Sequence, residues 1–408
     1  MRGPLALSSA IGWDFWALLG NPKFVAAPMV DQSERPFRLL CSQLGAHLTY
    51  TPMLHARLMV EVPAYRAAHF DAHVDVEEGP VFAQLAGHDP PTVLAAARLV
   101  EPHVTAVDLN FGCPQGIARK GRYGAFLLEE PETMAAVVKT LSRELTIPVT
   151  AKLRMMPTLE DTVRNCQQLE AAGASVLCLH GRTRQQNKQL SGGADWDVIA
   201  EVVRQVGVPV IANGGIATFE DVERCLKHTG AAAVMSSEAL LENPALFCRN
   251  MDPRTRHYLN QEELAYRYLD LCIEHPPSKG AAMMRPHLFK MLHHGLRTHT
   301  ELRDELLCAN HPDELRQIVR RLSSSGWLQP QFHTPSYQPE ISWYNRYRGA
   351  SDDNDDSADG KDDTGRSSME TLTREELEKR TLMKLEQKQI AKRRKRLARK
   401  ARRAAVVE

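Results

Sequence analysis

The sequence lacks long apolar runs, closely spaced cysteines and a large net charge. No apolar run among its 408 residues approaches the roughly 18 residues that span a bilayer, so we expect no membrane association. The apolar stretch from Leu5 to Ile11 is short and Asp14 soon follows it, so we also expect no cleavable export signal. These absences point to a soluble intracellular protein.

The eight cysteines are too scattered for a zinc site or a disulfide framework. Both need cysteines in close or regularly spaced pairs, whereas these stand singly at positions 41, 113, 166, 178, 225, 248, 272 and 308. The sequence therefore predicts no metal site, and its cysteine usage is typical of a reducing compartment.

The net charge of only +1 hides blocks of opposite sign. Residues 1–250 carry 22 basic and 26 acidic side chains, and residues 251–349 carry 13 and 11. Near the end of the chain, residues 352–363 hold seven aspartates, whereas residues 379–403 hold 13 lysines and arginines against one glutamate. Overall neutrality therefore does not exclude a polyanionic partner.

Strand and helix patterns alternate through the first 250 residues. Eight short β-rich runs are apolar on both faces, as strands of a covered parallel sheet must be. They are Phe24–Ala27, Leu48–Thr51, Val81–Leu85, Ala106–Asn110, Val149–Leu153, Val176–His180, Val208–Ala212 and Ala232–Ser236. Amphipathic spacing predicts helices over Thr92–Val100, Glu132–Leu145, Leu159–Ala172, Trp196–Val206 and Phe219–Lys227.

Eight such units in about 230 residues match an α/β fold of the (β/α)8 TIM-barrel type. An open doubly wound sheet is the alternative. It would usually place a GxGxxG turn after its first strand, where this chain has Ala26 to Met29 instead.

Beyond residue 255 the strand pattern gives way to helical signals. Helices are predicted over Gln261–Glu274, Pro286–Leu296, Thr300–Cys308 and Asp313–Ser323, in a small all-α domain. The next segment has the composition of a disordered linker, and a capping box at Thr373 predicts one more helix. The predicted divisions are an N-terminal extension 1–20, the barrel 21–250, the helical domain 255–334, an acidic disordered linker 335–368 and a basic helical tail 369–408.

Polar or special residues follow nearly every predicted strand, and in a TIM barrel these ends meet at one mouth. They include Pro28, Met29, Gln84, Asn110, Cys113, Lys152, Arg154, His180, Arg182, Asn213, Gly214, Gly215, Ser237 and Glu238. The loops after the seventh and eighth strands have the glycines and small residues of a phosphate site, although each alone could be a tight turn. Together they favour a cofactor that carries phosphate.

Three of these residues also have structural explanations. Lys152 at the end of a buried strand needs an anionic partner, unless its ammonium reaches solvent. His180 could be a buried histidine with its hydrogen bonds satisfied. Cys113 could be an inert thiol, but a cysteine that is mostly protonated at neutral pH can also donate its proton to carbon.

The sequence at these positions resembles the tRNA-dihydrouridine synthases. The matching segments cover about residues 20–250, and the helical segment to about 330 fits the family's tRNA-binding domain. The most specific match is Asn110 to Gln115 followed by Tyr123 to Ala125. The others are Ala27 to Met29, Gln84, Lys152 to Arg154, His180 to Arg184, Ala194 to Trp196 and Asn213 to Gly215.

The resemblance implies an oxidoreductase that uses FMN and NADPH to reduce the C5–C6 bond of a uridine in tRNA. The flavin would deliver hydride to C6, and Cys113 would protonate C5. Residues Pro28, Met29, Val30, Gln84, Lys152 and His180 would line the flavin ring, and Asn213, Gly214, Gly215, Ser237 and Glu238 its phosphate end. Substrate would contact Asn110, Arg119, Lys120, Arg154 and Arg182.

Two positions depart from the commoner family pattern. Bacterial members often have an acidic residue in place of Gly215, and Gly-Arg in place of Ser237 and Glu238. Backbone donors would survive these changes, whereas a phosphate contact from an arginine would not. The loop at Asp195 and the ending at Asn243 to Phe247 look most like the eukaryotic subfamily that modifies D-loop positions 16 and 17.

Two rival functions stay open, namely an FMN barrel acting on a free pyrimidine and an inactive RNA-binding protein on the same scaffold. The basic run around Lys392 to Arg396 suits a nuclear import signal, an RNA-contacting arm or a solvated helix. We expect the protein to bind tRNA and to be located in the cytoplasm, the nucleus or both. We also expect it to be a monomer.

Overall fold

The computed structural model describes residues 10–70, 79–187, 190–248, 260–325 and 343–344. All of them belong to one compact unit within residues 1–352. The linker predicted over 335–368, apart from Trp343 and Tyr344, and the tail over 369–408 lie outside the described residues, so the interpretations of the basic run stay predictions. Among the described residues, no helix is both long and apolar enough to cross a bilayer.

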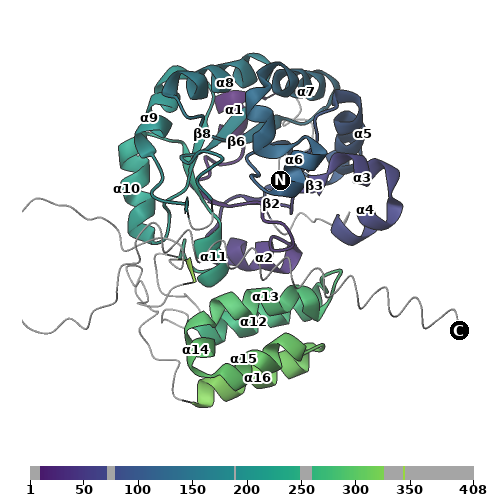
Figure 1. The fold of residues 1–408 in the computed structure, drawn as a ribbon, viewed down its shortest axis with the longest axis vertical. Coiled ribbons are helices and arrows are strands. Elements are labelled where there is room, and N and C mark those ends of the chain that lie inside the picture. The colour runs from purple at the N-terminus through teal and green to yellow at the C-terminus, as the bar shows by residue number, and fades with distance from the viewer. Residues whose placement is uncertain (1–9, 71–78, 188–189, 249–259, 326–342, 345–408) are drawn as a thin grey trace, which may run out of the picture. The chain divides into compact units, whose positions relative to one another are not determined.

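A parallel sheet forms the centre of the protein (Figure 1). Its neighbours run in the order β1, β9, β8, β7, β6, β5, β4, β2, with β3 also pairing with β4. The strands are β1 (Phe24–Ala26), β2 (Thr49–Tyr50), β3 (Leu54–His55), β4 (Val81–Ala86), β5 (Ala106–Phe111), β6 (Val149–Arg154), β7 (Val176–His180), β8 (Val210–Asn213) and β9 (Ala233–Ser236).

Backbone hydrogen bonds close the sheet into a barrel. The Ala26 N–H donates to the Leu48 carbonyl at 2.9 Å, and the His47 N–H donates to the Phe24 carbonyl at 2.8 Å, which joins β1 to the start of β2. All strand pairs are parallel. The predicted TIM-barrel fold is therefore confirmed.

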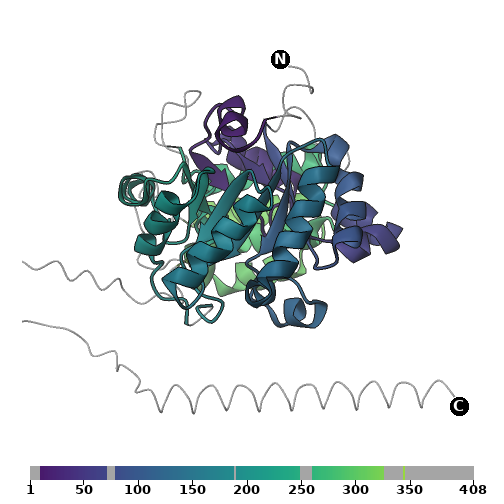
Figure 2. The same ribbon diagram turned by 90° about the horizontal axis from the view of Figure 1, so that it is seen from above.

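Helices cover the outside of the barrel (Figures 1 and 2). They are α2 (Arg35–Gln43), α3 (Ala56–Glu61), α4 (Pro63–His69), α5 (Pro90–Val100), α7 (Pro131–Glu144), α8 (Leu159–Ala171), α9 (Trp196–Gln205) and α10 (Phe219–Thr229), with 3-10 turns at η3 (Glu101–His103) and η4 (Gly124–Glu129). Two short helices, α6 (Gly116–Gly121) and α11 (Glu238–Glu242), lie instead at the carboxyl ends of the strands. The five predicted barrel helices all form, with ends within two residues of their predicted limits.

A short helix, α1 (Gly12–Leu18), lies in the segment that we predicted only as an N-terminal extension. Its Phe15 and Trp16 are fully buried in a cluster with residues of seven strands, among them Val25, Phe82 and Ile211. Large apolar side chains from outside the β/α repeat thus fill the barrel interior at the end away from the mouth. The periodicity of the strands contains no sign of this plug.

Helices after residue 260 pack beside the barrel, next to α2 and α11 (Figure 1). They are α12 (Gln261–Glu274), α13 (Ala281–Met291), α14 (His293–Thr298), α15 (Thr300–Cys308) and α16 (Pro312–Ser324). The predicted helix Pro286–Leu296 is wrong in its limits, because the structure places Pro286 inside α13 and starts α14 after Leu292. Leu264, Tyr268 and Leu288 belong to the same apolar core as the outer face of the barrel.

Candidate active site

A cavity of about 880 Å³ opens at the carboxyl ends of the strands. Parallel strands of a barrel all end on this rim, so residues far apart in sequence converge there. Of the residues predicted to form a site, those that line the cavity are Pro28, Met29, Val30, Gln84, Asn110, Cys113, Lys152, Arg154, His180, Arg182, Asn213, Gly214, Gly215, Ser237 and Glu238.

A chain of hydrogen bonds runs from the floor of the cavity to the Cys113 loop. The buried carboxylate of Asp108 accepts from Gln84 Nε2 at 2.8 Å and from Thr150 Oγ1 at 2.7 Å. Gln84 Oε1 in turn accepts from Asn110 Nδ2 at 2.7 Å. Because a carboxylate accepts only, Asp108 fixes which way the Gln84 amide points, and Gln84 then fixes the Asn110 amide.

Asn110 holds the backbone that carries Cys113. Its Oδ1 accepts from the Gly112 N–H at 3.1 Å and the Cys113 N–H at 3.0 Å. On the other side of the loop, Gly124 has a φ of +69°, and a Cβ there would lie 2.6 Å from the Cys113 carbonyl oxygen. Only glycine therefore fits behind Cys113 without displacement.

Burial raises the pKa of the Cys113 thiol above its usual value, although the Gln115 backbone and the charges of Arg154 and Lys152 act in the opposite direction. The thiol thus stays protonated at neutral pH. A protonated thiol at the wall of a cavity can act as a general acid.

Lys152 crosses the cavity floor from β6 to β8. Its Nζ donates to Asn213 Oδ1 at 3.0 Å, and Asn213 Nδ2 donates to the Met235 carbonyl at 2.9 Å. Desolvation lowers the pKa of Lys152 and the charge of Arg154 acts in the same direction, while the nearby carboxylate of Asp108 raises it. Within the described part of the chain, the one hydrogen bond of this ammonium goes to a neutral amide, so the site suits an electron-rich group of a ligand.

Two arginines hold the loop after β7. Arg154 donates to the carbonyls of Gly112 at 2.9 Å, Thr183 at 2.9 Å and Gln186 at 3.1 Å. Arg182 donates through Nη2 to the Gly192 carbonyl at 3.0 Å, and its Nη1 lies 3.1 Å from His180 Nε2. Burial, and then the charge of Arg182, lower the pKa of Arg154 to about 10, so it remains a cation at neutral pH.

The turn after β8 brings Gly214 and Gly215 to the cavity. Gly214 and Gly215 have φ values of +103° and +78°, and a Cβ on Gly214 would lie 2.8 Å from His180. Trp196 Nε1 fixes the turn by donating to the Gly214 carbonyl at 3.0 Å. Ser237 and Glu238 line the cavity beside this turn, at the start of α11.

Two predicted substrate residues lie elsewhere. Arg119 and Lys120 are exposed on α6 and do not line the cavity. Their contact with substrate stays a prediction, and it concerns the outer surface.

Several lining residues were missed by sequence reasoning, including Gln32, Gln186, Lys290, Trp343 and Tyr344. Gln32 and Gln186 lie in loops that follow recognised strand ends, so reading further along those loops would have found them. Lys290 and Trp343 reach the cavity from outside the barrel, and no strand pattern points to them. Among the described residues, no group of three or more His, Cys, Asp or Glu side chains could hold a metal ion.

Comparisons with known proteins fit this arrangement. Residues 25–325 match the family described as dihydrouridine synthase (Dus). The chain is 44% identical to a rat protein named "tRNA-dihydrouridine(16/17) synthase NAD(P)(+)-like". The aligned 296 residues cover 72% of this chain and 66% of the rat protein. It is 39% identical over 300 residues to the Schizosaccharomyces pombe protein named for the same positions, covering 72% and 75% of the two chains.

A human protein named "tRNA-dihydrouridine(20a/20b) synthase NAD(P)+-like" is 35% identical over 226 residues, which cover 55% of this chain and 70% of the human protein. The match to the rat protein described above extends over slightly less than two thirds of the rat protein's length. The family match includes the barrel from β1 onward and the helices to α16, and so this chain belongs to the dihydrouridine synthase family.

Proposed function

We propose that the protein is a tRNA-dihydrouridine synthase that reduces the C5–C6 bond of uridines in the tRNA D-loop, at positions 16 and 17, with FMN as cofactor and NADPH as reductant. The observation that carries the proposal is the placement of Cys113, whose backbone Asn110 holds at the wall of a cavity that Lys152 and Arg154 also line. The rat and yeast relatives, whose names specify positions 16 and 17, support the choice of uridines.

The residues present fit FMN. A cavity of about 880 Å³ lies within the range of pockets that enclose molecules of this size. The amides of Gln84 and Asn110 and the ammonium of Lys152 can hydrogen-bond the edge of a heterocycle. The glycine turn at Gly214 and Gly215 offers backbone N–H groups to phosphate, and Lys290 adds a positive charge to the cavity wall.

Bound FMN supplies the hydride that C6 of the uracil requires. The protein's own contribution at C5 is the Cys113 proton, which the raised pKa keeps on sulfur at neutral pH. Lys152 and Arg154, which both line the cavity, would stabilise negative charge that develops on the uracil oxygen during the reaction. Neither cation needs to move, because hydrogen bonds already hold both side chains.

A uridine inside folded tRNA must leave its stack to enter the cavity, which costs a few kcal/mol. Contacts with the RNA backbone outside the cavity would offset this cost. Exposed Arg119 and Lys120 on α6 are suited to such contacts.

The substitution Cys113→Ala tests the proposal. It should leave bound FMN and its yellow absorbance intact but reduce dihydrouridine formation by about 10²- to 10⁴-fold, the usual contribution of a general acid. Cys308→Ala, at an exposed cysteine on α15, is the matched control and should form product normally. A colourless wild-type protein, or normal product from Cys113→Ala, would contradict the proposal.

A further inference from the structure

The loop that follows β1 forms one wall of the cavity. Its residues Ala27 to Val30 and Gln32 line the cavity. The loop contains Asp31 at a φ of +56°, a left-handed conformation that aspartate tolerates better than most residues but at a small cost relative to glycine. Contacts around the loop offset this cost.

Hydrogen bonds within the loop help to fix its conformation. The Met29 N–H donates to Ser33 Oγ at 3.0 Å, and Ser33 Oγ donates to the Met29 carbonyl at 3.1 Å. Arg38 from α2 donates to the Ser33 carbonyl at 2.9 Å. The position of Met29 therefore depends on the residues at the start of α2.

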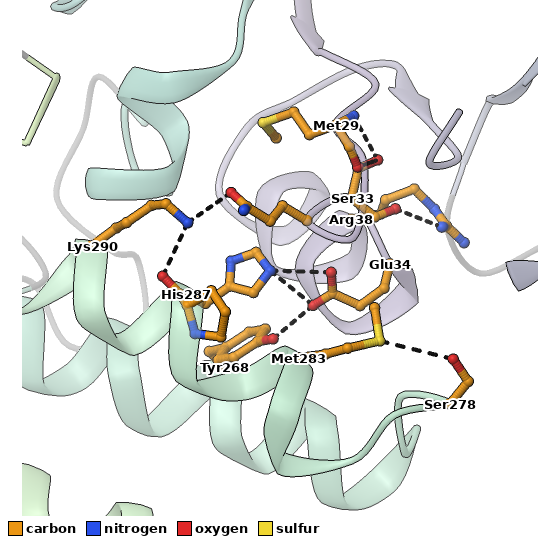
Figure 3. Close-up of polar contacts among 11 residues, drawn as sticks. Met29, Ser33, Glu34, Arg38, Tyr268, Ser278, Met283, His287 and Lys290 are labelled. Carbon is orange, nitrogen blue, oxygen red and sulfur yellow. Dashed lines mark hydrogen bonds and ion pairs between the residues drawn. The ribbon is translucent and has the colours of Figure 1, made fainter. Parts of the chain in front are cut away.

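Glu34, the residue before α2, is held by two helices from outside the barrel (Figure 3). Its Oε1 accepts from Tyr268 Oη of α12 at 2.6 Å, and His287 Nε2 of α13 lies 3.1 Å from Oε2. All three side chains are buried, and the His287 ring stacks on Phe37 with centroids 4.5 Å apart. Hydrogen bonds to a buried carboxylate are among the stronger ones in proteins.

The charge state of Glu34 agrees with this geometry. Burial by itself would raise its pKa, but attraction to His287 and the hydrogen bonds from His287 and Tyr268 lower the pKa below its usual value. Glu34 is thus a carboxylate at neutral pH, which can accept both bonds.

Two lysines contact the same loop further along. Lys290 of α13 (Figure 3) donates to Gln32 Oε1 at 2.7 Å. Lys290 also lines the cavity. Lys279 pairs with Asp31 at 2.7 Å, but both side chains are about half exposed, so this pair adds little. Four residues from α12, α13 and the connection between them thus contact the three loop residues Asp31, Gln32 and Glu34.

We propose that α12 and α13 complete the cofactor pocket, with Tyr268 and His287 acting through Glu34 as positioning residues for the loop that carries Met29. This inference rests on the proposed function, because it assigns the cavity to FMN. It adds a role for the helical segment that does not depend on contact with tRNA. Since coupling between two sites is reciprocal, FMN binding should in turn stabilise the packing of α12 and α13 on α2.

The first test is Tyr268→Phe, which removes one donor to Glu34 and keeps the ring. Hydrogen exchange of the full chain as purified should be faster at the Met29 and Gln32 amides by about tenfold, the value of one bond to a carboxylate. The matched control is Tyr266→Phe, the same chemical change on the same helix at a partly exposed tyrosine outside this cluster. Unchanged exchange in Tyr268→Phe overturns the inference.

The second test measures FMN affinity by flavin absorbance and fluorescence. Tyr268→Phe should weaken FMN binding by about tenfold, whereas Tyr266→Phe should bind like the wild type. Glu34→Ala should weaken binding further, and Glu34→Gln, which keeps an oxygen acceptor for Tyr268, should recover part of the loss. Lower thermal stability with unchanged FMN affinity would mean a structural contact only and would overturn the inference.

The two proposals fail separately. If the wild-type chain binds no FMN, the proposed function fails, while the exchange experiment still decides whether Tyr268 holds the loop. If the wild-type chain binds FMN and all four variants bind it equally well, the proposed function stands and the positioning role is rejected.

Discussion

Asp108→Asn provides a quantitative test of the cavity floor. The Asp108 side chain is fully buried beneath Gln84 and Thr150. Asparagine has nearly the same shape, and its Oδ1 can accept from Gln84 while its amide donates to Thr150 Oγ1. The substitution therefore keeps the hydrogen-bond chain toward Cys113 but removes a buried ionisable group.

The magnitude follows from the pKa of Asp108. Burial raises it from 3.8 to about 6, although bonds from Gln84 and Thr150 and the charge of Lys152 lower it in part. Below pH 3.8 the group is protonated in both the folded and the unfolded protein and costs nothing. Between pH 3.8 and about 6 the unfolded chain loses this proton while the folded protein keeps it, so the group destabilises the fold by about 1 kcal/mol at pH 4.5. Above about pH 6 the folded state holds a buried carboxylate and the cost levels off at about 3 kcal/mol, as at pH 7.5.

The free energy of unfolding of wild type and Asp108→Asn should be measured by urea denaturation at both pH values, with matched FMN content. The gain of the variant over the wild type should be about 2 kcal/mol larger at pH 7.5 than at pH 4.5. The difference in free energy between asparagine and the protonated acid does not depend on pH, so it cancels in this comparison. A gain that differs by less than about 0.5 kcal/mol between them would refute the view that Asp108 is a strained buried carboxylate.

Two further substitutions test the elements that support the cavity. Gly124 has a φ of +69°, and the new Cβ of Gly124→Ala would lie 2.6 Å from the Cys113 carbonyl oxygen. The substitution should therefore lower the free energy of unfolding by about 1–3 kcal/mol and slow product formation by displacing Cys113. Gly193→Ala, where nothing lies near the new Cβ, is the control. Equal urea midpoints for the two variants would contradict this reasoning. Trp16→Ala should cost about 3–5 kcal/mol of unfolding free energy, because Trp16 is 1% exposed inside the barrel, whereas Trp13→Ala on the same helix, at 55% exposed, should cost far less. A small loss for Trp16→Ala would show that the barrel interior does not depend on α1.

Local patterns in the sequence determined the barrel. Strands buried on both faces must be apolar throughout, so runs such as Ala106–Asn110 and Val176–His180 identify themselves, and their ends mark the mouth. The residues at those ends, from Gln84 to Asn213, were therefore predicted to lie together, and the structure places them in one cavity. The resemblance of the segment at Cys113 to a known family added the chemistry.

Only the tertiary structure decided which long-range partners complete the site. Tyr268 and His287 meet Glu34 across more than 230 residues of sequence, and Phe15 and Trp16 fill the barrel from a short helix that precedes the β/α repeat. Nothing in the local sequence of its strand distinguishes Asp108. Its part in the site depends on the Gln84 amide and the Thr150 hydroxyl, which lie on the two neighbouring strands. The spacing of apolar residues predicts which face of a helix or strand is buried. It does not predict which distant residues cover that face, because those contacts form only when the elements pack in three dimensions.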